Sequence, residues 1–427
     1  MGPQLFLAAT CLLAALCTMT SAAAERPCDV PAARALVLGS GGSKGAFQAG
    51  AVYHLVVHRG CDFVEISGTS VGALNGALLA QASRSDDAAV SLANMRAAAE
   101  NLIDEWTSIE SSREVFRSRP LGKLRFALFG LDSIENFAPL RAFVREHVSL
   151  ERLAAGRELR VGTMSIDDGR YHEILINRDG HIDRDTAHDF ILGSAIVPTF
   201  ARMPVITPPE GGAALQFADG GVRHATPVRS YFQACTPMAE CIPLTGQNTP
   251  PHPRIEQLFV VVTSPYARFD DRRPIFDPKA IDRRSGHIDD GRRILVRLFD
   301  LLIDTLYRDD LDDALMYNDI LTAQVGGAAD PTRTFPLGSF NRSADAALPY
   351  EIAVIAPERE DADPMSIFEV EPDKQRREMY CGCLAADEWM VTHHEAASFS
   401  EKCEARFPPL RAKRGSTPPP LEPAQCR

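Results

Sequence analysis

The sequence predicts an α/β fold built on a mainly parallel sheet, and two observations lead to this prediction. Strand-like and helix-like segments alternate early in the chain, with strands at 34–38 and 62–67 and helices at 46–56 and 71–82. This βαβα order implies parallel strands joined by right-handed crossovers. The 427 residues are 45% hydrophobic and 24% charged, the balance of a globular chain that can bury a sizeable core.

The net charge excludes one class of partner. The formal charge is −12, which argues against nucleic-acid binding and against strong attraction to anionic membrane surfaces. Zwitterionic and neutral lipids stay possible, because apolar burial rather than charge would capture them.

The N-terminus predicts export. Residues 1–24 have the character of a signal peptide: the apolar run from Leu5 to Met19 is short for a membrane span, and small residues lead to a cleavage point near Ala24. We therefore expect a secreted or periplasmic protein. The alternative is an N-terminal membrane anchor.

The cysteines agree with export. Cys11 and Cys17 would leave with the signal peptide, and the remaining eight form an even set that predicts disulfides. Cys28 and Cys61 each precede a strand of one sheet, so we expect them to pair. The others are expected to form a Cys235–Cys241 pair and two further pairs among Cys381, Cys383, Cys403 and Cys426, of open connectivity.

A metal site is the alternative for part of this set. The segment Cys381-Gly382-Cys383 could bind a metal together with His393 or His394. The second half of a zinc motif is missing, so disulfides remain the main expectation.

The segment Gly68-Thr69-Ser70-Val71-Gly72 predicts a sharp strand-to-helix turn with a serine at its apex. Glycines on both sides allow the tight backbone and leave room for a substrate. The hydroxyl of Ser70 would stand at a helix N-terminus, where backbone amides favour developing negative charge.

The glycine loop at 39–45 precedes this turn by one strand and has three interpretations. A phosphate-binding P-loop requires Ser or Thr after the lysine, but Gly45 follows Lys44. A dinucleotide fingerprint requires a third glycine where Lys44 stands. A nest of free amides for an anion remains, and beside Ser70 this nest would be an oxyanion hole.

The rest of the chain extends the α/β pattern over a domain at 30–395, followed by a Pro-rich, Cys-containing tail at 396–427. The segment 113–130 is either a cap over the site or a surface excursion. We expect helices at 88–106, 139–147, 185–197, 294–325 and 373–390, a hairpin at 159–165 and 171–176, and strands at 216–222, 258–264 and 350–356.

Three ordered motifs resemble the signature of the patatin-like phospholipases. They are the loop at 40–50, the turn at 68–72 and the triplet Asp219-Gly220-Gly221, and the helix-proline segment 194–198 before the acid is also similar. The resemblance covers 33 to about 375. It implies a three-layer α/β/α sandwich with a mainly parallel sheet, and lipid acyl hydrolysis by a Ser–Asp dyad without metal or cofactor.

Matching these motifs residue by residue implies roles. Ser70 would be the nucleophile and Asp219 the general base, and burial of the carboxylate would raise its pKa towards working pH. Two departures from the family pattern stand out: Ser40 replaces the first loop glycine, and the segment 224–228 lacks the Asn that many members have before Pro. The oxyanion donors would be the amides of Gly41, Gly42 and Ser43, and the supporting motif positions are Lys44, Gly45, Gly68, Gly72, Gly220 and Gly221.

Two other functions fit parts of the pattern. An α/β-hydrolase with a Ser–Asp–His triad could recruit His252, His393 or His394, although that fold places more strands before its nucleophile. A lipid-binding module on a degenerate hydrolase scaffold would not need the intact serine and acid. The preferred partner is a lipid or phospholipid ester, met at a transient membrane or micelle surface.

Overall fold

The computed structural model describes most of the α/β core. The described residues are 28, 32–118, 135–177, 184–207, 213–228, 231, 255–266, 306, 310–316, 318–319, 351–358, 369–394, 396–407 and 426.

An eight-stranded sheet forms the centre of the protein, in the order β10-β9-β1-β2-β5-β8-β7, with β6 paired to β5. The five strands from β10 to β5 are parallel, while β6, β8 and β7 are antiparallel additions. The sheet is therefore mainly parallel, as predicted. Its strands are β1 (Arg34–Leu38), β2 (Glu65–Thr69), β5 (Glu158–Ser165), β6 (Tyr171–Leu175), β7 (Val205–Ile206), β8 (Leu215–Asp219), β9 (Gln257–Val261) and β10 (Glu351–Ile355).

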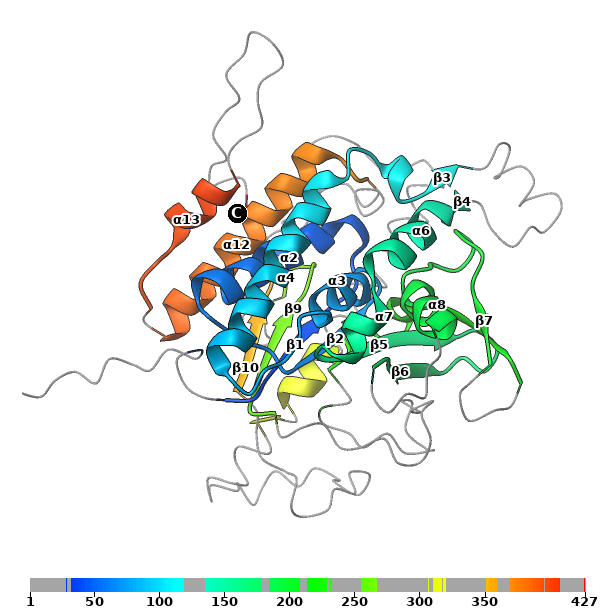
Figure 1. Cartoon of the computed structure of the whole chain (residues 1–427), viewed down its shortest axis with the longest axis horizontal. Coiled ribbons are helices and arrows are strands. Elements are labelled where there is room, and N and C mark those ends of the chain that lie inside the picture. The colour runs from blue at the N-terminus through cyan, green and yellow to red at the C-terminus, as the bar shows by residue number, and fades with distance from the viewer. Residues whose placement is uncertain are drawn as a thin grey trace, which may run out of the picture.

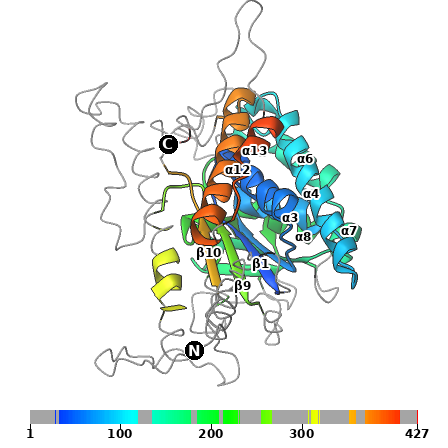
Figure 2. The same ribbon diagram turned by 90° about the vertical axis from the view of Figure 1, so that its left-hand side faces the viewer.

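Helices cover the sheet on both faces. Figures 1 and 2 show α2, α3, α4 and α12 on one face, and the helical segment at 310–316, drawn in yellow, on the other. This arrangement is the three-layer α/β/α sandwich. The helices are α2 (Gly45–Tyr53), α3 (Val71–Ala80), α4 (Ala88–Ser108), α6 (Ala138–His147), α7 (Leu150–Ala154), α8 (Arg184–Ser194), α12 (Pro372–His394) and α13 (Ser400–Arg406).

Short elements complete the described fold. A π-helical turn, η2 (His54–His58), continues α2. A two-stranded sheet joins β3 (Arg117–Ser118) to β4 (Glu135–Asn136). The 3₁₀ turns are η1 (Gly42–Lys44), η3 (Ser112–Glu114) and η4 (Gly220–Val222).

The alternation of side chains in β1 explains its central place. All five of its residues are buried. Leu36 and Leu38 join the larger hydrophobic cluster, whereas Ala35 and Val37 join a second cluster on the opposite face. Because successive strand residues point to opposite faces, one apolar strand serves both layers of the sandwich.

Helices α2 and α12 touch backbone to backbone. A Cβ atom on Gly50 would lie 1.8 Å from the carbonyl oxygen of Met379, and one on Gly382 would lie 1.9 Å from that of Phe47. Only glycine fits at such separations. The C-terminal helix is therefore seated directly on the helix that follows the glycine loop.

The disulfides confirm one predicted pair and give the connectivity of four other cysteines. Cys28 bonds to Cys61. The two C-terminal bonds are Cys381–Cys426 and Cys383–Cys403. The predicted Cys235–Cys241 pair lies outside the described residues.

The metal alternative for Cys381 and Cys383 is wrong, because each sulfur is bonded to another cysteine. His393 instead faces the Trp389 carbonyl, and His394 lies 3.6 Å from a carboxylate oxygen of Glu351. Within the described part of the chain, one group, formed by His54, Cys383 and Cys403, has the spacing to hold a metal ion, and there the two sulfurs are joined to each other.

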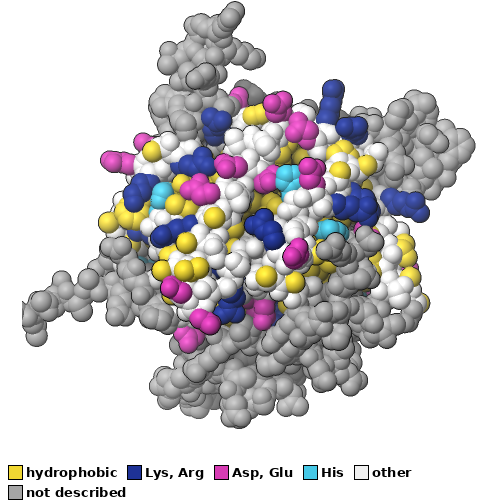
Figure 3. Space-filling model, in the orientation of Figure 1, with side chains coloured by type: hydrophobic (Ala, Val, Ile, Leu, Met, Phe, Trp, Pro, Cys, Tyr) yellow, Lys and Arg dark blue, Asp and Glu magenta, His cyan; other side chains and the backbone are white. Residues whose placement is uncertain are grey.

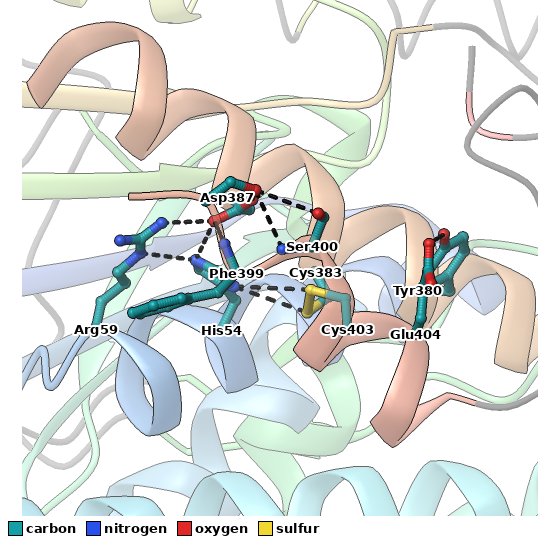
Figure 4. The surroundings of a disulfide bond; sticks show 10 residues. His54, Arg59, Tyr380, Cys383, Asp387, Phe399, Ser400, Cys403 and Glu404 are labelled. Carbon is teal, nitrogen blue, oxygen red and sulfur yellow. Dashed lines mark hydrogen bonds and ion pairs between the residues drawn. A yellow bond between two sulfur atoms is a disulfide. The ribbon is translucent and has the colours of Figure 1, made fainter. Parts of the chain in front are cut away.

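A buried polar group surrounds the Cys383–Cys403 bond (Figure 4). Arg59 Nε donates to His54 Nε2 at 3.0 Å and Arg59 Nη2 donates to Asp387 Oδ1 at 2.5 Å. Burial lowers the pKa of His54 to about 3, so the ring is neutral at physiological pH and carries its proton on Nδ1. That nitrogen lies 3.8 and 3.7 Å from the two sulfur atoms.

The described helices and strands follow the prediction closely. The hairpin is β5–β6, and the helices expected at 88–106, 139–147, 185–197 and 373–390 are α4, α6, α8 and α12. The predicted tail contains α13, which Cys403 ties to α12. Most of the helix expected at 294–325 lies outside the described residues. Among the residues that the structure describes, no helix is long and apolar enough to cross a membrane.

Candidate active site

Ser70 occupies a strained backbone position between β2 and α3. Its φ and ψ are 58° and −125°, an unusual conformation for a residue with a side chain. The flanking glycines make the turn possible: a Cβ on Gly68 would lie 2.2 Å from the Gly72 carbonyl oxygen, and one on Gly72 would lie 2.2 Å from that of Leu38. Strain of this kind, held by surrounding packing, is typical of functional positions.

The Ser70 hydroxyl faces the carboxylate of Asp219. Ser70 Oγ donates to Asp219 Oδ2 at 2.7 Å, across 149 residues of sequence. Asp219 ends β8, which pairs with β5, the neighbour of β2 in the sheet. The sheet topology thus brings the two residues together.

The environment of Asp219 suits a base. Burial raises the pKa of its carboxyl group to about 6, although hydrogen bonds from Ser70 and from the Gly221 amide work in the opposite direction. The Gly221 amide donates to Asp219 Oδ1 at 2.7 Å and leaves Oδ2 to the serine. A Cβ on Gly221 would lie 2.6 Å from Ser40 Oγ, so only glycine fits beside the loop.

The end of α8 holds both residues in place. The backbone amide of Ser70 donates to Ser194 Oγ at 2.9 Å, and Ser194 Oγ in turn donates to the Gly162 carbonyl at 2.6 Å. Two residues further on, the Ile196 carbonyl accepts from the Asp219 amide at 2.8 Å. One segment, 194–196, therefore contacts the backbone of the serine and of the acid.

The glycine loop turns its carbonyl groups away from the serine. The Gly39 carbonyl accepts from Gln48 Nε2 at 2.6 Å, and the Ser40 carbonyl accepts from Thr263 Oγ1 at 2.7 Å. Gly41 and Gly42 have φ values of 150° and 56°, which favour glycine. Among the residues that the structure describes, neither of these two amides donates to a protein acceptor. They are therefore available to an anion.

A cavity of about 360 Å³ joins the serine to the loop. Ser70, Asp219 and the glycine loop form its polar end. The rest of the wall is mostly apolar and includes Leu74, Leu78, Trp106, Ile109, Val115, Phe116, Phe137, Leu140 and Phe143. Such a wall suits a hydrocarbon chain.

Lys44 adds a positive charge to this cavity. Its side chain is 6% exposed and lines the cavity wall. Over the described residues, no hydrogen bond or ion pair joins its ammonium group to another side chain. A cation in that position can meet an anionic group of a bound molecule.

The structure gathers most of the predicted site residues around one cavity. Ser70, Asp219, Gly41, Gly42, Ser43, Lys44 and Gly221 line it. The other predicted glycines serve packing: a Cβ on Gly45 would meet Val71 at 2.2 Å, and one on Gly220 would meet the Gly162 carbonyl oxygen at 2.6 Å.

The histidines of the triad alternative have other neighbours. His393 and His394 lie on α12 and contact Trp389 and Glu351, and neither lines the cavity. His252 lies outside the described residues. In this structure the serine therefore meets a carboxylate directly.

Sequence reasoning missed three contacts of the site. Ser194 lies in the helix-proline segment that was noted only as a similarity. Thr263 follows the apolar strand β9, and its place at the end of a buried strand was the only feature of the sequence that could have indicated a role at the site. Gln48 lies in the motif at 40–50, but the resemblance assigned it no role.

A serine at a strained strand-to-helix turn, a buried acid and an open loop of amides are the groups that hydrolysis of an ester by a serine requires. Residues 36–231, nearly half of the chain, match the family model described as "Patatin-like phospholipase". This segment is similar to a patatin-like phospholipase domain, a family of lipid ester hydrolases.

Solved structures give weaker similarities. VipD from Legionella pneumophila aligns at a TM-score of 0.32 and 10% identity, over 85% of this chain and 68% of that chain. The type III effector protein ExoU aligns at a TM-score of 0.22 and 19% identity, over 43% of this chain and 42% of that chain. The comparison with curated proteins gives no match.

Proposed function

We propose that this protein is an exported phospholipid acyl hydrolase, of phospholipase A or lysophospholipase type, that forms an acyl-enzyme on Ser70. The observation that carries the proposal is the 2.7 Å hydrogen bond from Ser70 Oγ to the buried Asp219. A hydroxyl becomes a good nucleophile when a positioned base takes its proton. Asp219 is that base.

In the first half-reaction, Ser70 Oγ attacks the ester carbonyl carbon while its proton moves to Asp219 Oδ2. The carbonyl oxygen becomes an oxyanion and accepts hydrogen bonds from the amides of Gly41 and Gly42, supported by Ser43. Collapse breaks the bond to the alcohol, which leaves with the proton from Asp219. The acyl group stays on Ser70.

In the second half-reaction, water gives a proton to Asp219 and adds its oxygen to the acyl carbon. The same amides hold the second oxyanion. The bond to Ser70 Oγ then breaks, the serine regains the proton, and the fatty acid leaves. One carboxylate thus serves as base and acid in alternate steps.

The cavity suggests how a phospholipid would bind. Its apolar wall takes one acyl chain, and the buried Lys44 ammonium can pair with the phosphate. Lys44→Gln should raise KM for phospholipids more than for neutral acyl esters, and Lys44→Arg should retain the preference. Equal effects on both substrates would remove phosphate recognition from the proposal.

The export part of the proposal rests on residues 1–24 and on the disulfides. N-terminal sequencing of protein recovered outside the cytoplasm should give a start just after Ala24. An intact Met1 on the exported protein would contradict cleavage.

Activity tests separate the alternatives. Ser70→Ala and Asp219→Asn should each abolish ester hydrolysis, while His393→Ala should retain it; the reverse pattern for Asp219 and His393 would support a triad. A fluorophosphonate probe should label wild type and not Ser70→Ala, and failure to label wild type would favour a binding module. Mass spectrometry of products from a mixed lipid extract would identify the substrate.

A further inference from the structure

We propose that Asn75 is a positioning residue for the oxyanion loop, acting through Gln48, and that it links this loop to the acyl cavity through Trp106. The inference rests on the proposed function, because it concerns how the oxyanion donors are held. Asn75 borders the cavity, but its side-chain hydrogen bonds go to Gly45, Gln48 and Trp106 and not to Ser70 or Asp219. It lies on α3, one turn beyond Ser70.

The side-chain amide of Asn75 uses three hydrogen bonds. Nδ2 donates to the Gly45 carbonyl and to Gln48 Oε1, both at 3.0 Å. Oδ1 accepts from Trp106 Nε1 at 2.9 Å. The residue is 2% exposed, so a lost partner would leave a buried polar group unpaired. Three helices, α2, α3 and α4, therefore meet at one amide.

These bonds fix the direction of the Gln48 amide. Gln48 is fully buried, and its Oε1 accepts from Asn75, so its Nε2 must face the other way, towards the Gly39 carbonyl at 2.6 Å. Turning either amide round would set donor against donor. Since Trp106 can only donate, a single direction of hydrogen bonding runs from its indole to the loop.

The loop carbonyls decide where the loop amides point. A peptide unit is planar and trans, so its N–H and C=O point in opposite directions. Gln48 anchors the carbonyl of the Gly39–Ser40 unit, whose amide donates to the Ala225 carbonyl at 2.8 Å. Thr263 anchors the next carbonyl, that of Ser40, which turns the Gly41 amide towards the site. Without the hydrogen bond from Gln48, the Gly39–Ser40 peptide unit would be less firmly held, and the Ser40–Gly41 unit that carries the Gly41 amide could rotate.

The first donor in this series of hydrogen bonds, Trp106, borders the substrate cavity. The Trp106 ring lines the apolar wall, and its N–H points away to Asn75. An acyl chain against that ring would hold the indole, and through it the two amides. Binding of the acyl chain would thereby hold the oxyanion donors in position, so part of the energy of binding that acyl chain would appear as a higher kcat.

The test uses Asn75→Asp, which keeps the shape and the acceptor for Trp106 but removes both donors. Asn94→Asp is the matched control, since Asn94 makes the same kind of bonds to Ser83 on the exposed side of α4. We expect kcat for a long-chain ester to fall about tenfold or more in Asn75→Asp, with KM little changed, and the control to match wild type. A loss confined to KM, or no loss, would overturn the proposal.

A spectroscopic measurement separates positioning from general destabilisation. A phosphonate bound to Ser70 places its oxygen where the oxyanion forms, so its ³¹P resonance reports on the amides. The resonance should shift in Asn75→Asp and stay unchanged in Asn94→Asp. Trp106→Phe, which keeps a smaller aromatic ring in the wall and removes the N–H, should shift it in the same direction and lower kcat for long acyl chains more than for acetyl esters. An unchanged resonance in both variants contradicts the inference.

Failure of this inference is distinguishable from failure of the proposed function. If Ser70→Ala abolishes hydrolysis and Asn75→Asp keeps the full kcat, only the positioning role is wrong. If Ser70→Ala remains active, the acyl-enzyme on Ser70 is wrong. Gln48→Glu gives a second test of these hydrogen bonds. It replaces the amide group that donates to the Gly39 carbonyl by a carboxylate oxygen, which cannot donate, and it should reproduce the loss of kcat.

Discussion

Ser194 Oγ accepts a hydrogen bond of 2.9 Å from the backbone amide of Ser70, although 124 residues separate them. The same hydroxyl donates to the Gly162 carbonyl on β5. A single side chain therefore fixes the strained turn that carries the nucleophile. Figure 3 shows basic and acidic side chains interspersed on the face of the protein that Figure 1 presents.

Ser194→Ala should lower activity without removing any group that meets the substrate. The Ser70 amide and the Gly162 carbonyl would lose their buried partner, which costs about 1–3 kcal/mol. We expect a fall in kcat of about tenfold and a lower unfolding midpoint, measured by ester hydrolysis and urea titration. Ser85→Ala is the control, at an exposed serine whose Oγ accepts from the Asp87 amide. Equal activity of both variants would show that the turn at Ser70 keeps its conformation without the hydrogen bond to Ser194.

The activity should depend on the ionisation of Asp219. Burial raises the pKa of this carboxyl group to about 6, and the base acts only when deprotonated. The value of kcat/KM should therefore rise with pH up to about 6 and level off above it, falling about tenfold per unit on the acid side. Thermal unfolding at each pH checks that the protein is folded. A profile that is flat between about pH 5 and 7 would rule out this carboxylate as the base.

Asp219→Asn should make the protein more stable while abolishing activity. The folded pKa of Asp219 lies above the unfolded value, so the folded state holds the proton more tightly, and stability is lost as pH rises from about 4 to about 6. Asparagine carries no charge, so its burial causes no such loss. Its side-chain oxygen can still accept from the Gly221 amide, and its NH₂ group can donate to Ser70 Oγ. Above about pH 7 we expect a gain of about 1–3 kcal/mol in the free energy of unfolding.

The comparison with wild type should be made over a range of pH. The gain should vanish below about pH 4, where Asp219 is protonated in both folded and unfolded chains. If the variant were less stable than wild type at neutral pH, burial of the charged Asp219 carboxylate would not destabilise the folded protein, and the prediction would be wrong.

Removing the Cys383–Cys403 bond should destabilise the fold. The two cysteines are 20 residues apart, and closing a loop of that size contributes about 3 kcal/mol through the entropy of the unfolded chain. The double variant Cys383→Ala/Cys403→Ala should unfold at lower urea concentration. Wild type treated with a reductant should behave likewise if the buried bond can be reached. An unchanged midpoint for the double variant would contradict a structural role.

The parts of the site that the sequence made predictable are local. The turn at Ser70 and the glycine loop follow from short-range steric demands. Strand β1 was predicted to the residue, because four apolar residues that follow Arg34 run directly into the glycine loop. The Cys28–Cys61 pair followed from two neighbouring strands. Asp219 was found because its motif stands in order with the other two.

The contacts around these motifs depend on distant segments. Thr263 and Asn75 carry no local pattern, and Ser194 lies in a segment whose similarity does not reveal its partner; each meets its partner only when the sheet is assembled. Thr263 meets the loop across 223 residues, and that pairing follows from β9 lying next to β1. Side-chain amides in helices resemble surface residues until packing encloses them.

The backbone contact between α2 and α12 has a practical consequence for anyone shortening this chain. The family segment ends at residue 231, yet β9, Thr263 and the helix seated on Gly50 all come later. A truncation at that residue would bare the edge of β1 and one whole side of α2 to solvent, which invites aggregation. The smallest unit to express therefore extends through Cys426, the disulfide partner of Cys381 on α12, and its boundaries follow from the sheet and the disulfides and not from the motif.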